Sequence, residues 1–384
     1  MKICVYAICK NEEKFVDRWL SSMREADGIY VLDTGSSDAT VKLLTEGGAH
    51  VTVREVSPWR FDRARNLSLA LVPPDADVCV CTDLDEYFHP GWREKLERAW
   101  TEDCLRAYYR YTWNFNEDGS EGCVFRYSKI HRRWGVYWLH PVHEILAFSY
   151  GVTGKSIFVD GIQLDHKADP AKSRGQYLPL LELSVSEMPS DDRNTHYLGR
   201  EYYFYGRWED SIRTLKRHLS LPSATWKDER AASMRYISKC YFRLGNPAEG
   251  EAWMLRAIAE APHLREPLID AATYYLGIKN WEGVIFFTKK ALSLSEKTST
   301  YITEKNAYGA LPHDLLSVAL FYEGKKSEAL VEAEKAHALS PHDERIGKNV
   351  DLIRAALSAD PQAQRNEDQR ITSKKITTSP SAIR

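Results

Sequence analysis

Short apolar runs separated by amphipathic stretches fill the first part of the chain. The runs cover residues 3–8, 29–32, 51–56 and 78–81. Continuous apolar runs of this length are typical of strands buried on both faces of a parallel sheet. Between the first two runs, Phe15 and Trp19 have the spacing of one helix face, and Asn11 is placed to cap that helix. Helical spacing returns at residues 41–44 and 63–71, so the pattern predicts an α/β domain with a mainly parallel sheet and helices on both faces.

The pattern changes at about Tyr108. Shorter, aromatic-rich segments of β character follow at residues 108–115, 123–130, 142–146 and 157–164. We expect these segments to extend the sheet and to form the acceptor side of a cleft.

From about Asn194 the apolar spacing is helical and repeats with a period close to the ~34 residues of tetratricopeptide repeats. Turns recur at residues 205–208, 244–247, 279–281 and 323–326. Small residues that let paired helices approach closely recur before these turns at Gly199, Ser238, Ala272 and Ser317, and after them at Ala257, Ala291 and Ala336, with His218 in the equivalent place of the first unit. The sequence therefore predicts an α/β catalytic domain at residues 1–189, an all-α tetratricopeptide-like repeat domain at 190–358 and a polar, disordered tail at 359–384.

Composition and charge narrow the class of protein. The 384 residues are 43% hydrophobic and 28% charged, the ordinary mix of a globular protein. A formal net charge of -2 provides no basic field to attract nucleic acid. No apolar stretch approaches the roughly 20 residues of a membrane span, and the N-terminus lacks the layout of a signal peptide. Seven cysteines, an odd number without paired C-x-x-C spacing, argue against a disulfide framework or a structural zinc site, so we expect a reducing, cytoplasmic location.

Polar residues cluster where the predicted strands end. Asp83-Leu84-Asp85 follows the fourth apolar run, and Asp33 follows the second. Ligands of parallel α/β sheets bind at the carboxyl ends of the strands. Two carboxylates one residue apart can present oxygens to one hard cation, Mn²⁺ or Mg²⁺, which would bridge a diphosphate. Asp33 can accept hydrogen bonds from a ribose or a base, and Arg65 is suited to orient a phosphate or one of the acidic residues.

Four motifs in order along the chain resemble those of family-2 inverting glycosyltransferases with the A-type (GT-A) fold. They are Ala7-Ile8-Cys9-Lys10-Asn11-Glu12, Asp33-Thr34-Gly35-Ser36-Ser37-Asp38-Ala39-Thr40, Phe61-Asp62-Arg63-Ala64-Arg65-Asn66 and Asp83-Leu84-Asp85-Glu86. The later Val142-His143-Glu144 and Asp165-His166 are similar to the lipopolysaccharide-core glucosyltransferase branch of that family. With its C-terminal repeats, the layout is similar to sublancin-type peptide S-glycosyltransferases of bacteria. The resemblance is specific through about His166 and concerns only the architecture beyond it.

The resemblance implies a metal-dependent hexosyltransferase that takes its sugar from a UDP-sugar. Asp33 would contact the nucleoside, with the strand edge at Ala7 and the Asn11-Glu12 pair nearby.

The resemblance also implies a metal site. Asp83 would lie near the ribose or the metal, Asp85 would bind the metal directly, and His166 would be a further metal ligand or a diphosphate contact. Leu84 stands where many relatives have a small residue, and we expect its side chain to face away from the metal.

Glu144 is the candidate general base that deprotonates the acceptor for in-line attack on the anomeric carbon. It follows His143 on a short predicted strand near Trp138, where partial burial would suit a role in proton transfer. The alternative is a carboxylate on an edge strand, exposed to water. His166 has the alternative of a core or loop histidine, and Trp113 and Trp138 are equally consistent with core packing and with sugar stacking.

Two other classes of protein stay open at this point. The run that ends in Asp83 superficially matches haloacid-dehalogenase-like phosphatases, in which Asp83 would be the nucleophile, although that motif normally lies on the first strand. The chain is also consistent with a non-catalytic scaffold, in which the helical repeats are the functional part and the first domain only binds a nucleotide. In the glycosyltransferase interpretation, the repeats hold two chains together as a homodimer or bind the acceptor, a hydroxyl or thiol of a peptide or glycan.

Overall fold

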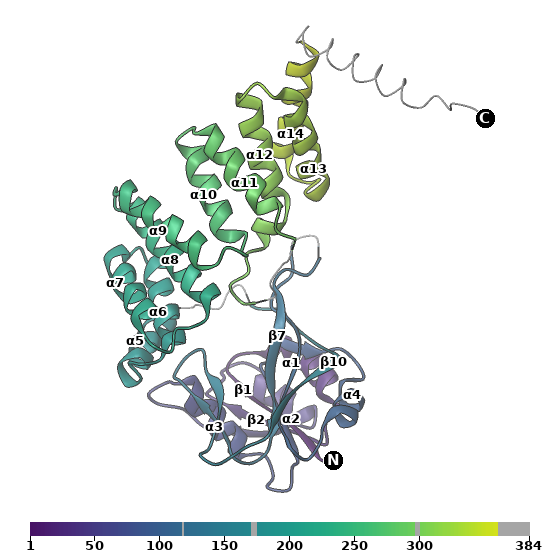
Figure 1. Cartoon of the computed structure of the whole chain (residues 1–384). Helices are drawn as coiled ribbons and strands as arrows, with labels where there is room; N and C mark the ends of the chain where they lie inside the picture. The colour runs from purple at the N-terminus through teal and green to yellow at the C-terminus, as the bar shows by residue number, and fades with distance from the viewer. Residues whose placement is uncertain (117–118, 170–174, 296–299, 360–384) are drawn as a thin grey trace, which may run out of the picture. The chain divides into compact units, whose positions relative to one another are not determined.

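The computed structural model describes residues 1–116, 119–169, 175–295 and 300–359. The chain divides into two compact units (Figure 1). The first comprises residues 1–225 with a short segment that ends at Tyr301, and the second comprises the remainder from Trp226 onward. The predicted disordered tail at 359–384 lies outside the described residues except for Ala359.

One mixed sheet of eight strands organises the first unit, in the order β3-β2-β1-β4-β7-β6-β10-β5. The strands are β1 (Ile3–Cys9), β2 (Gly28–Asp33), β3 (His50–Val53), β4 (Val78–Thr82), β5 (Glu86–Phe88), β6 (Cys104–Thr112), β7 (Val124–Arg132) and β10 (Lys155–His166). Strands β1 to β4 are parallel to one another, as predicted. The prediction of a mainly parallel sheet is wrong for the other half, because β7 runs antiparallel to both β4 and β6 and β5 runs antiparallel to β10. A separate two-stranded sheet pairs β8 (Val136–Leu139) with β9 (Ile145–Phe148).

The parallel half of the sheet creates a crevice. Strand β1 lies between β2 and β4, so the chain leaves β1 toward one side of the sheet and returns to it from the other. Ligands of open α/β sheets bind at the carboxyl ends of the strands where the order reverses in this way. The loops that follow β1, β2 and β4 therefore meet at one place.

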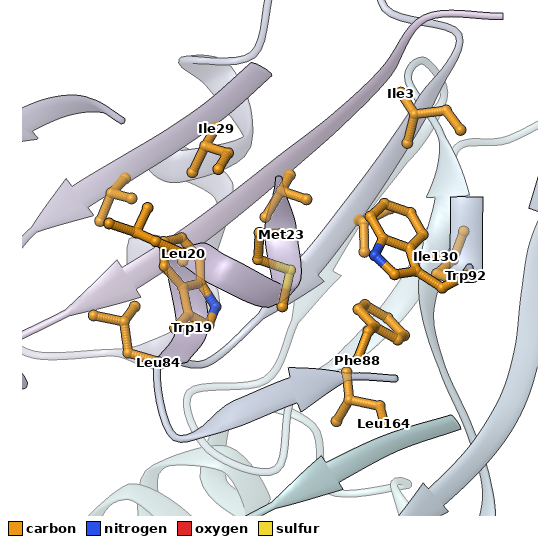
Figure 2. Packing of buried hydrophobic residues seen from close by; sticks show 14 of the residues in the cluster. Ile3, Trp19, Leu20, Met23, Ile29, Leu84, Phe88, Trp92, Ile130 and Leu164 are labelled. Atoms are coloured by element: carbon orange, nitrogen blue, oxygen red, sulfur yellow. The ribbon is translucent and has the colours of Figure 1, made fainter. Parts of the chain in front are cut away.

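Helix α1 (Glu13–Met23) covers one face of the sheet. Its buried residues Phe15, Trp19 and Met23 join the largest apolar cluster, part of which Figure 2 shows. The Trp19 indole donates to Thr82 Oγ1 (3.0 Å), which ties the helix to the end of β4. Helices α2 (Thr40–Glu46) and α4 (Trp92–Ala99) contribute to the same cluster, where the rings of Phe88 and Trp92 stack with centroids 5.1 Å apart.

The opposite face is covered by α3 (Phe61–Ala70) and by the β8–β9 hairpin, which bury a second cluster. A chain of buried hydrogen bonds runs through it: the Trp138 indole donates to the Tyr6 hydroxyl (2.7 Å), and that hydroxyl lies 2.7 Å from His131 Nε2. His131 Nδ1 lies 2.7 Å from the Arg132 carbonyl oxygen, which only accepts. The helices on both faces that the sequence predicts are thus present.

Three helices complete the first unit: α5 (Tyr177–Glu187), α6 (Asp192–Phe204) and α7 (Trp208–Ser220). Leu181, Val185 and Tyr202 form an apolar cluster that also contains Val142 from the β8–β9 connection, with Trp59 and Phe61 packed against it. The first predicted repeat hairpin is therefore packed within the compact unit of the sheet. The predicted domain boundary at 189/190 stays a prediction about the chain's modules and differs from the boundary of this compact unit.

The second unit consists of paired helices (Figure 1): α8 (Lys227–Arg243) with α9 (Pro247–Glu260), α10 (Glu266–Gly277) with α11 (Trp281–Leu292), and α12 (Ala310–Tyr322) with α13 (Lys326–Leu339), followed by α14 (Glu344–Ser358). A short 3₁₀ helix, η1 (Lys305–Tyr308), precedes α12. All four predicted turns fall between paired helices. Gly206, Gly245 and Gly324 have positive φ there, and Lys279 takes the same left-handed position (φ 57°) in the remaining turn.

The small residues of the repeats lie at close helix contacts, as predicted. Ser211 on α7 donates to the Gly199 carbonyl (2.7 Å), and Ser238 on α8 donates to the Gly250 carbonyl (2.6 Å). Ala257, Ala291 and Ala336 are fully buried, and so is His218. Along the described part of the chain, no helix combines the length and the apolar character that crossing a membrane requires.

Candidate active site

The end of β2 forms a tight turn around Asp33. Its Oδ1 accepts from the backbone N–H groups of Gly35 and Ser36 (both 2.9 Å), and its Oδ2 accepts from the Ser36 hydroxyl and, at 3.3 Å, the Cys9 thiol. The Asp33 side chain is fully buried. In this structure its carboxylate orders the turn, and the expected contact with a nucleoside stays a prediction.

The end of β1 meets that turn through backbone and side-chain bonds. Asn11 accepts from the Ser37 N–H at Oδ1 (2.8 Å), and its own N–H donates to Ser36 (2.8 Å). The prediction that Asn11 caps α1 is wrong: Glu12 occupies the cap position, without a side-chain cap, because the Asn11 amide reaches across to the β2 loop. Glu12 is buried, and its N–H donates to Thr40 (2.7 Å).

Ala7 lies one step further back, on β1 itself. It is fully buried, and its carbonyl accepts from the Ser68 hydroxyl (2.6 Å). Ala7 thus lies on the strand that leads to Asn11 and Glu12, and its expected place beside the nucleoside stays a prediction.

Arg65 joins two carboxylates from distant parts of the chain. Its Nη2 lies 2.9 and 3.2 Å from the Asp83 oxygens, and its Nε donates to Glu144 Oε1. The guanidinium is 4% exposed and lies over the Trp138 ring, 5.3 Å from its centroid. Of the two roles predicted for Arg65, the orientation of acidic residues is the one that the geometry shows.

A second buried cation, Lys129 on β7, lies on the other side of Asp83. Its Nζ is 2.7 Å from Asp83 Oδ2 and 2.9 Å from Glu86 Oε1. Glu86 also accepts from the Asp83 N–H and from the Tyr111 hydroxyl (both 2.8 Å). Lys129, Glu86 and Tyr111 were not predicted as partners in the site.

These charges shift the ionisation of the acidic residues. Burial by itself raises the pKa of Asp83, but the cations Arg65 and Lys129 lower it by more, so the pKa lies well below its ordinary value. For Glu86, burial prevails over the attraction of Lys129 and raises the pKa. Asp83 therefore stays ionised across the whole physiological range.

Asp85 and His166 form the second half of the D-x-D region. Asp85 Oδ2 lies 3.3 Å from His166 Nε2, and both side chains are nearly buried. His166 Nδ1 lies 2.9 Å from the Trp113 carbonyl oxygen, an acceptor, so Nδ1 carries the proton and Nε2 faces the carboxylate. Burial alone lowers the pKa of His166, but Asp85, Glu86 and the Trp113 carbonyl together raise it by more, so the net shift of the pKa is upward.

The residues around this pair differ in exposure. Leu84 is 1% exposed and belongs to the main apolar cluster, so its side chain faces away from the carboxylates and only its backbone is available to a ligand. Trp138 is 3% exposed and is a core residue. Trp113 is 42% exposed and tilts over His166 with ring centroids 4.7 Å apart, which leaves sugar stacking as its candidate role.

Glu144 lies at the end of the connection between β8 and β9, residues 140–144. The prediction of a strand at 142–146 is wrong for its first half, because His143 has a left-handed backbone (φ 50°) and pairing begins only at Ile145. The Glu144 side chain is 12% exposed and paired with Arg65. The structure thus brings Glu144, Arg65 and Asp83 together. Asp85 follows Asp83 two residues later in the chain and lies against His166.

Comparison with known families agrees with this geometry. Residues 4–139 match the model of the family described as Glycosyl transferase family 2. This part of the chain is therefore similar to family-2 glycosyltransferase domains, and helical repeats follow it. The match contains Asp33, Arg65, Asp83 and Asp85, and it ends before Glu144 and His166.

Comparison with whole proteins adds less. No curated protein sequence matches the chain significantly. Similar solved structures include the APC/C hetero-tetramer Cut9-Hcn1 (13% identity, TM-score 0.39, covering 49% of this chain and 34% of that one) and YrrB, described as a TPR protein with an unusual peptide-binding site (14%, 0.37, 50% and 91%). MamA is a third (15%, 0.35, 44% and 89%). The repeat architecture rests on the helix pairs described above.

Proposed function

We propose that the chain is a UDP-sugar-dependent glycosyltransferase that uses a divalent cation and transfers a hexose, with inversion, to a hydroxyl or thiol of a glycan or peptide. The observation that carries this proposal is the convergence of Asp83, Asp85 and Glu144 at the strand ends of a family-2 glycosyltransferase domain. The phosphatase alternative lacks such support, because Arg65 and Lys129 already hold both oxygens of Asp83, its required nucleophile.

The residues present fit a divalent cation. Asp85 Oδ2 and His166 Nε2 lie close enough together to bind one metal ion. The Trp113 carbonyl accepts from Nδ1–H of His166, which leaves the Nε2 lone pair free for a metal. Arg65 and Lys129 pair with the carboxylates of Asp83, Glu86 and Glu144, and Asp85 lies against His166. With the four carboxylates ionised and His166 neutral, these described residues carry a formal charge of -2. A bound Mn²⁺ or Mg²⁺ would stabilise the charge that develops on a leaving diphosphate.

The chain's own residues account for the remaining steps. The β1 and β2 loops around Asn11 and Asp33 form the wall that would receive the nucleoside. Glu144 would take the proton from the acceptor nucleophile, and its pairing with Arg65 fixes the carboxylate in one orientation. Inversion follows when a base on one side of the anomeric carbon activates an attack in line with the leaving group on the other.

The repeats would serve the acceptor or a second copy of the chain. Stacked helical pairs leave extended faces that commonly bind protein or peptide. A homodimer through the repeats is the alternative use of the same faces.

The test is a screen of UDP-sugars for release of UDP in the presence of Mn²⁺. We expect turnover of at least one UDP-sugar, loss of turnover in EDTA, and an increase in the thermal midpoint with UDP and Mn²⁺ together by mass action. Asp85→Ala should abolish turnover. Asp103→Ala, which changes an exposed aspartate of the same unit, should leave it unchanged. Full activity in EDTA or in Asp85→Ala would rule out the metal-dependent mechanism.

A further inference from the structure

Every residue of the β8–β9 connection that carries Glu144 contacts another part of the first unit. Residues 140–144 join β8 to β9, and His140 and His143 both have positive φ, a conformation that residues other than glycine adopt rarely and at a cost. Such a conformation persists only where the surroundings impose it. The surroundings here are chiefly helix α5, which ends the predicted catalytic domain, and helix α6, which begins the predicted repeat region.

The first half of the connection packs on α5 and on the segment between α5 and α6. His140 lies 3.4 Å from both Ser184 Oγ and Asp191 Oδ2. The Pro141 carbonyl accepts from the Phe61 N–H (3.0 Å). Val142 is 2% exposed and buried in the cluster with Leu181.

The second half is held by α6. Arg193 Nη1 donates to the His143 carbonyl oxygen (2.6 Å), and the His143 ring stacks on Tyr197 with centroids 4.1 Å apart and planes 15° apart. The Arg193 guanidinium also lies over the Tyr197 ring, 4.9 Å from its centroid. Tyr197 and Arg193 therefore fix the position of His143, the residue that directly precedes Glu144.

We propose that Arg193 and Tyr197 are positioning residues for the glycosyl transfer step, and that α5 and α6 belong to the catalytic apparatus. This proposal rests on the proposed function of Glu144. Each contact fixes the backbone next to Glu144, and none touches Asp33, Asp83 or Asp85. The loss of one contact should therefore misplace the base and leave donor binding intact.

The test uses the full chain and two pairs of variants. Arg193→Gln removes the guanidinium, whereas Arg193→Lys keeps one cationic donor. Tyr197→Leu removes the ring stack, whereas Tyr197→Phe keeps it. Arg213→Gln on α7, an exposed arginine that pairs with Asp210, is the matched control.

Steady-state UDP release is measured with the UDP-sugar that the wild-type chain turns over fastest, and the Kd for UDP by calorimetry. We expect kcat to fall about 10- to 100-fold in Arg193→Gln and Tyr197→Leu, the scale of a displacement of about 1 Å. The Kd for UDP should stay within about twofold. Arg193→Lys should recover part of kcat, and Tyr197→Phe and Arg213→Gln should match the wild type. Normal kcat in both Arg193→Gln and Tyr197→Leu, or a parallel loss of kcat and UDP binding, would overturn the proposal.

Amide hydrogen exchange separates this proposal from the proposed function. In Arg193→Gln, exchange at the Phe61 amide should accelerate whether or not any sugar is transferred, because this amide donates to the Pro141 carbonyl of the connection. If exchange accelerates but the chain turns over no UDP-sugar, Arg193 does hold the connection at residues 140–144, and the proposed function fails. Unchanged exchange would show that Arg193 does not hold the backbone of residues 140–144.

Discussion

Arg65 and Lys129 are charged side chains at 4% and 3% exposure, which is costly unless each is paired. The structure meets this cost with carboxylates from three separate segments: the β4 loop, β5 and the β8–β9 connection. Removal of either cation would leave a buried carboxylate without its partner, so their contribution to stability cannot be separated from their contribution to the site.

Arg65 was predictable from sequence and Lys129 was not. Arg65 stands in a motif that opens helix α3 and resembles one of the family-2 glycosyltransferase motifs, which suggested a function for it. Lys129 lies on strand β7 between Ser128 and Ile130, and a lysine in such a strand normally faces water. It is buried because β7 is inserted between β4 and β6, and the hydrophobic pattern of a single strand does not specify its neighbours.

Glu144→Gln should keep UDP binding and lose sugar transfer. The amide has nearly the same shape as the carboxylate but no basicity, and general-base catalysis typically contributes 10²- to 10⁴-fold. The Kd for UDP and kcat for UDP release are the measurements. Glu94→Gln, on the exposed face of α4, is the control and should be unaffected. Near-normal kcat in Glu144→Gln at neutral pH would move the role of base to another residue.

His131 should make the first unit sensitive to acid. Burial lowers its pKa to about 4 from an ordinary 6.5, and both ring nitrogens are used as a neutral imidazole requires. Between pH 6.5 and 4 the unfolded chain binds this proton and the folded chain does not, so stability is complete above pH 6.5 and falls as the pH decreases. The loss reaches about 3 kcal/mol near pH 4.

Urea unfolding at pH 7, 6 and 5 measures this effect. His131→Gln keeps a donor and an acceptor in place and cannot titrate, so its stability should depend less on pH over this window. Equal pH dependence in the two chains would show that His131 is not responsible.

Among the elements, sequence reasoning recovered those with strong periodicity and missed the short ones. The strands β1 to β4 and helices α1 to α3 were all expected, within a few residues at their ends. Helix α4 was not expected, although its buried residues Trp92 and Leu96 have helical spacing. Strands β5 and β8 were not expected either, because they are only three and four residues long. Pieces of that length are defined by their pairing partners and carry no periodic signal of their own.

Helix α6 should not tolerate a side chain at Gly199. A Cβ there would lie 2.4 Å from Cγ and Cδ2 of Leu215 on α7, so the two helices would have to separate. Gly199→Ala should therefore destabilise the first unit by about 1–3 kcal/mol, although alanine is the better helix former.

The matched control is Gly277→Ala at the end of α10, where a Cβ would meet nothing within 4 Å. It should be neutral or stabilising by up to about 1 kcal/mol. Urea unfolding followed by circular dichroism compares the two variants with the wild type. A neutral Gly199→Ala would mean that α6 and α7 separate at little cost.

At the scale of the molecule, the repeat period predicted every helix pair, because small residues and left-handed turns recur in the sequence itself. The pattern could not show that the first pair packs with the sheet. That packing depends on single apolar residues such as Val142 and Phe61, which are scattered through the α/β domain.

A chain shortened to residues 1–225 should fold and bind UDP, whereas one that ends at Pro189 should not fold stably. The shorter chain loses α6 and exposes Leu181, Val185 and Val142 to water. Calorimetry with UDP and circular dichroism compare the two. Equal UDP binding by both would show that the sheet does not need its neighbouring helices.

Transfer to the natural acceptor tests the second unit. If the repeats bind the acceptor, the 1–225 chain should still hydrolyse the UDP-sugar and release UDP but should transfer the sugar poorly. If the repeats bind a second copy, the 1–225 chain should be a monomer in light scattering and the full chain a dimer. If the 1–225 chain transfers sugar at the full rate and has the same oligomeric state as the full chain, the repeats bind some other partner.

The guanidinium of Arg65 bonds to Asp83 and Glu144 at once, and this sharing has a thermodynamic consequence. Any ligand that draws the Asp83 carboxylate toward itself weakens one of the two bonds and strengthens the other, so the two substrates become energetically coupled. Because such coupling is reciprocal, an occupied donor site must alter acceptor affinity by the same factor by which the acceptor alters donor affinity. We therefore expect cooperativity between the two substrates, which Arg65→Lys should weaken, since one ammonium cannot span both carboxylates. Equal coupling in Arg65→Lys, measured by binding titrations with and without the second substrate, would show that the communication takes another route.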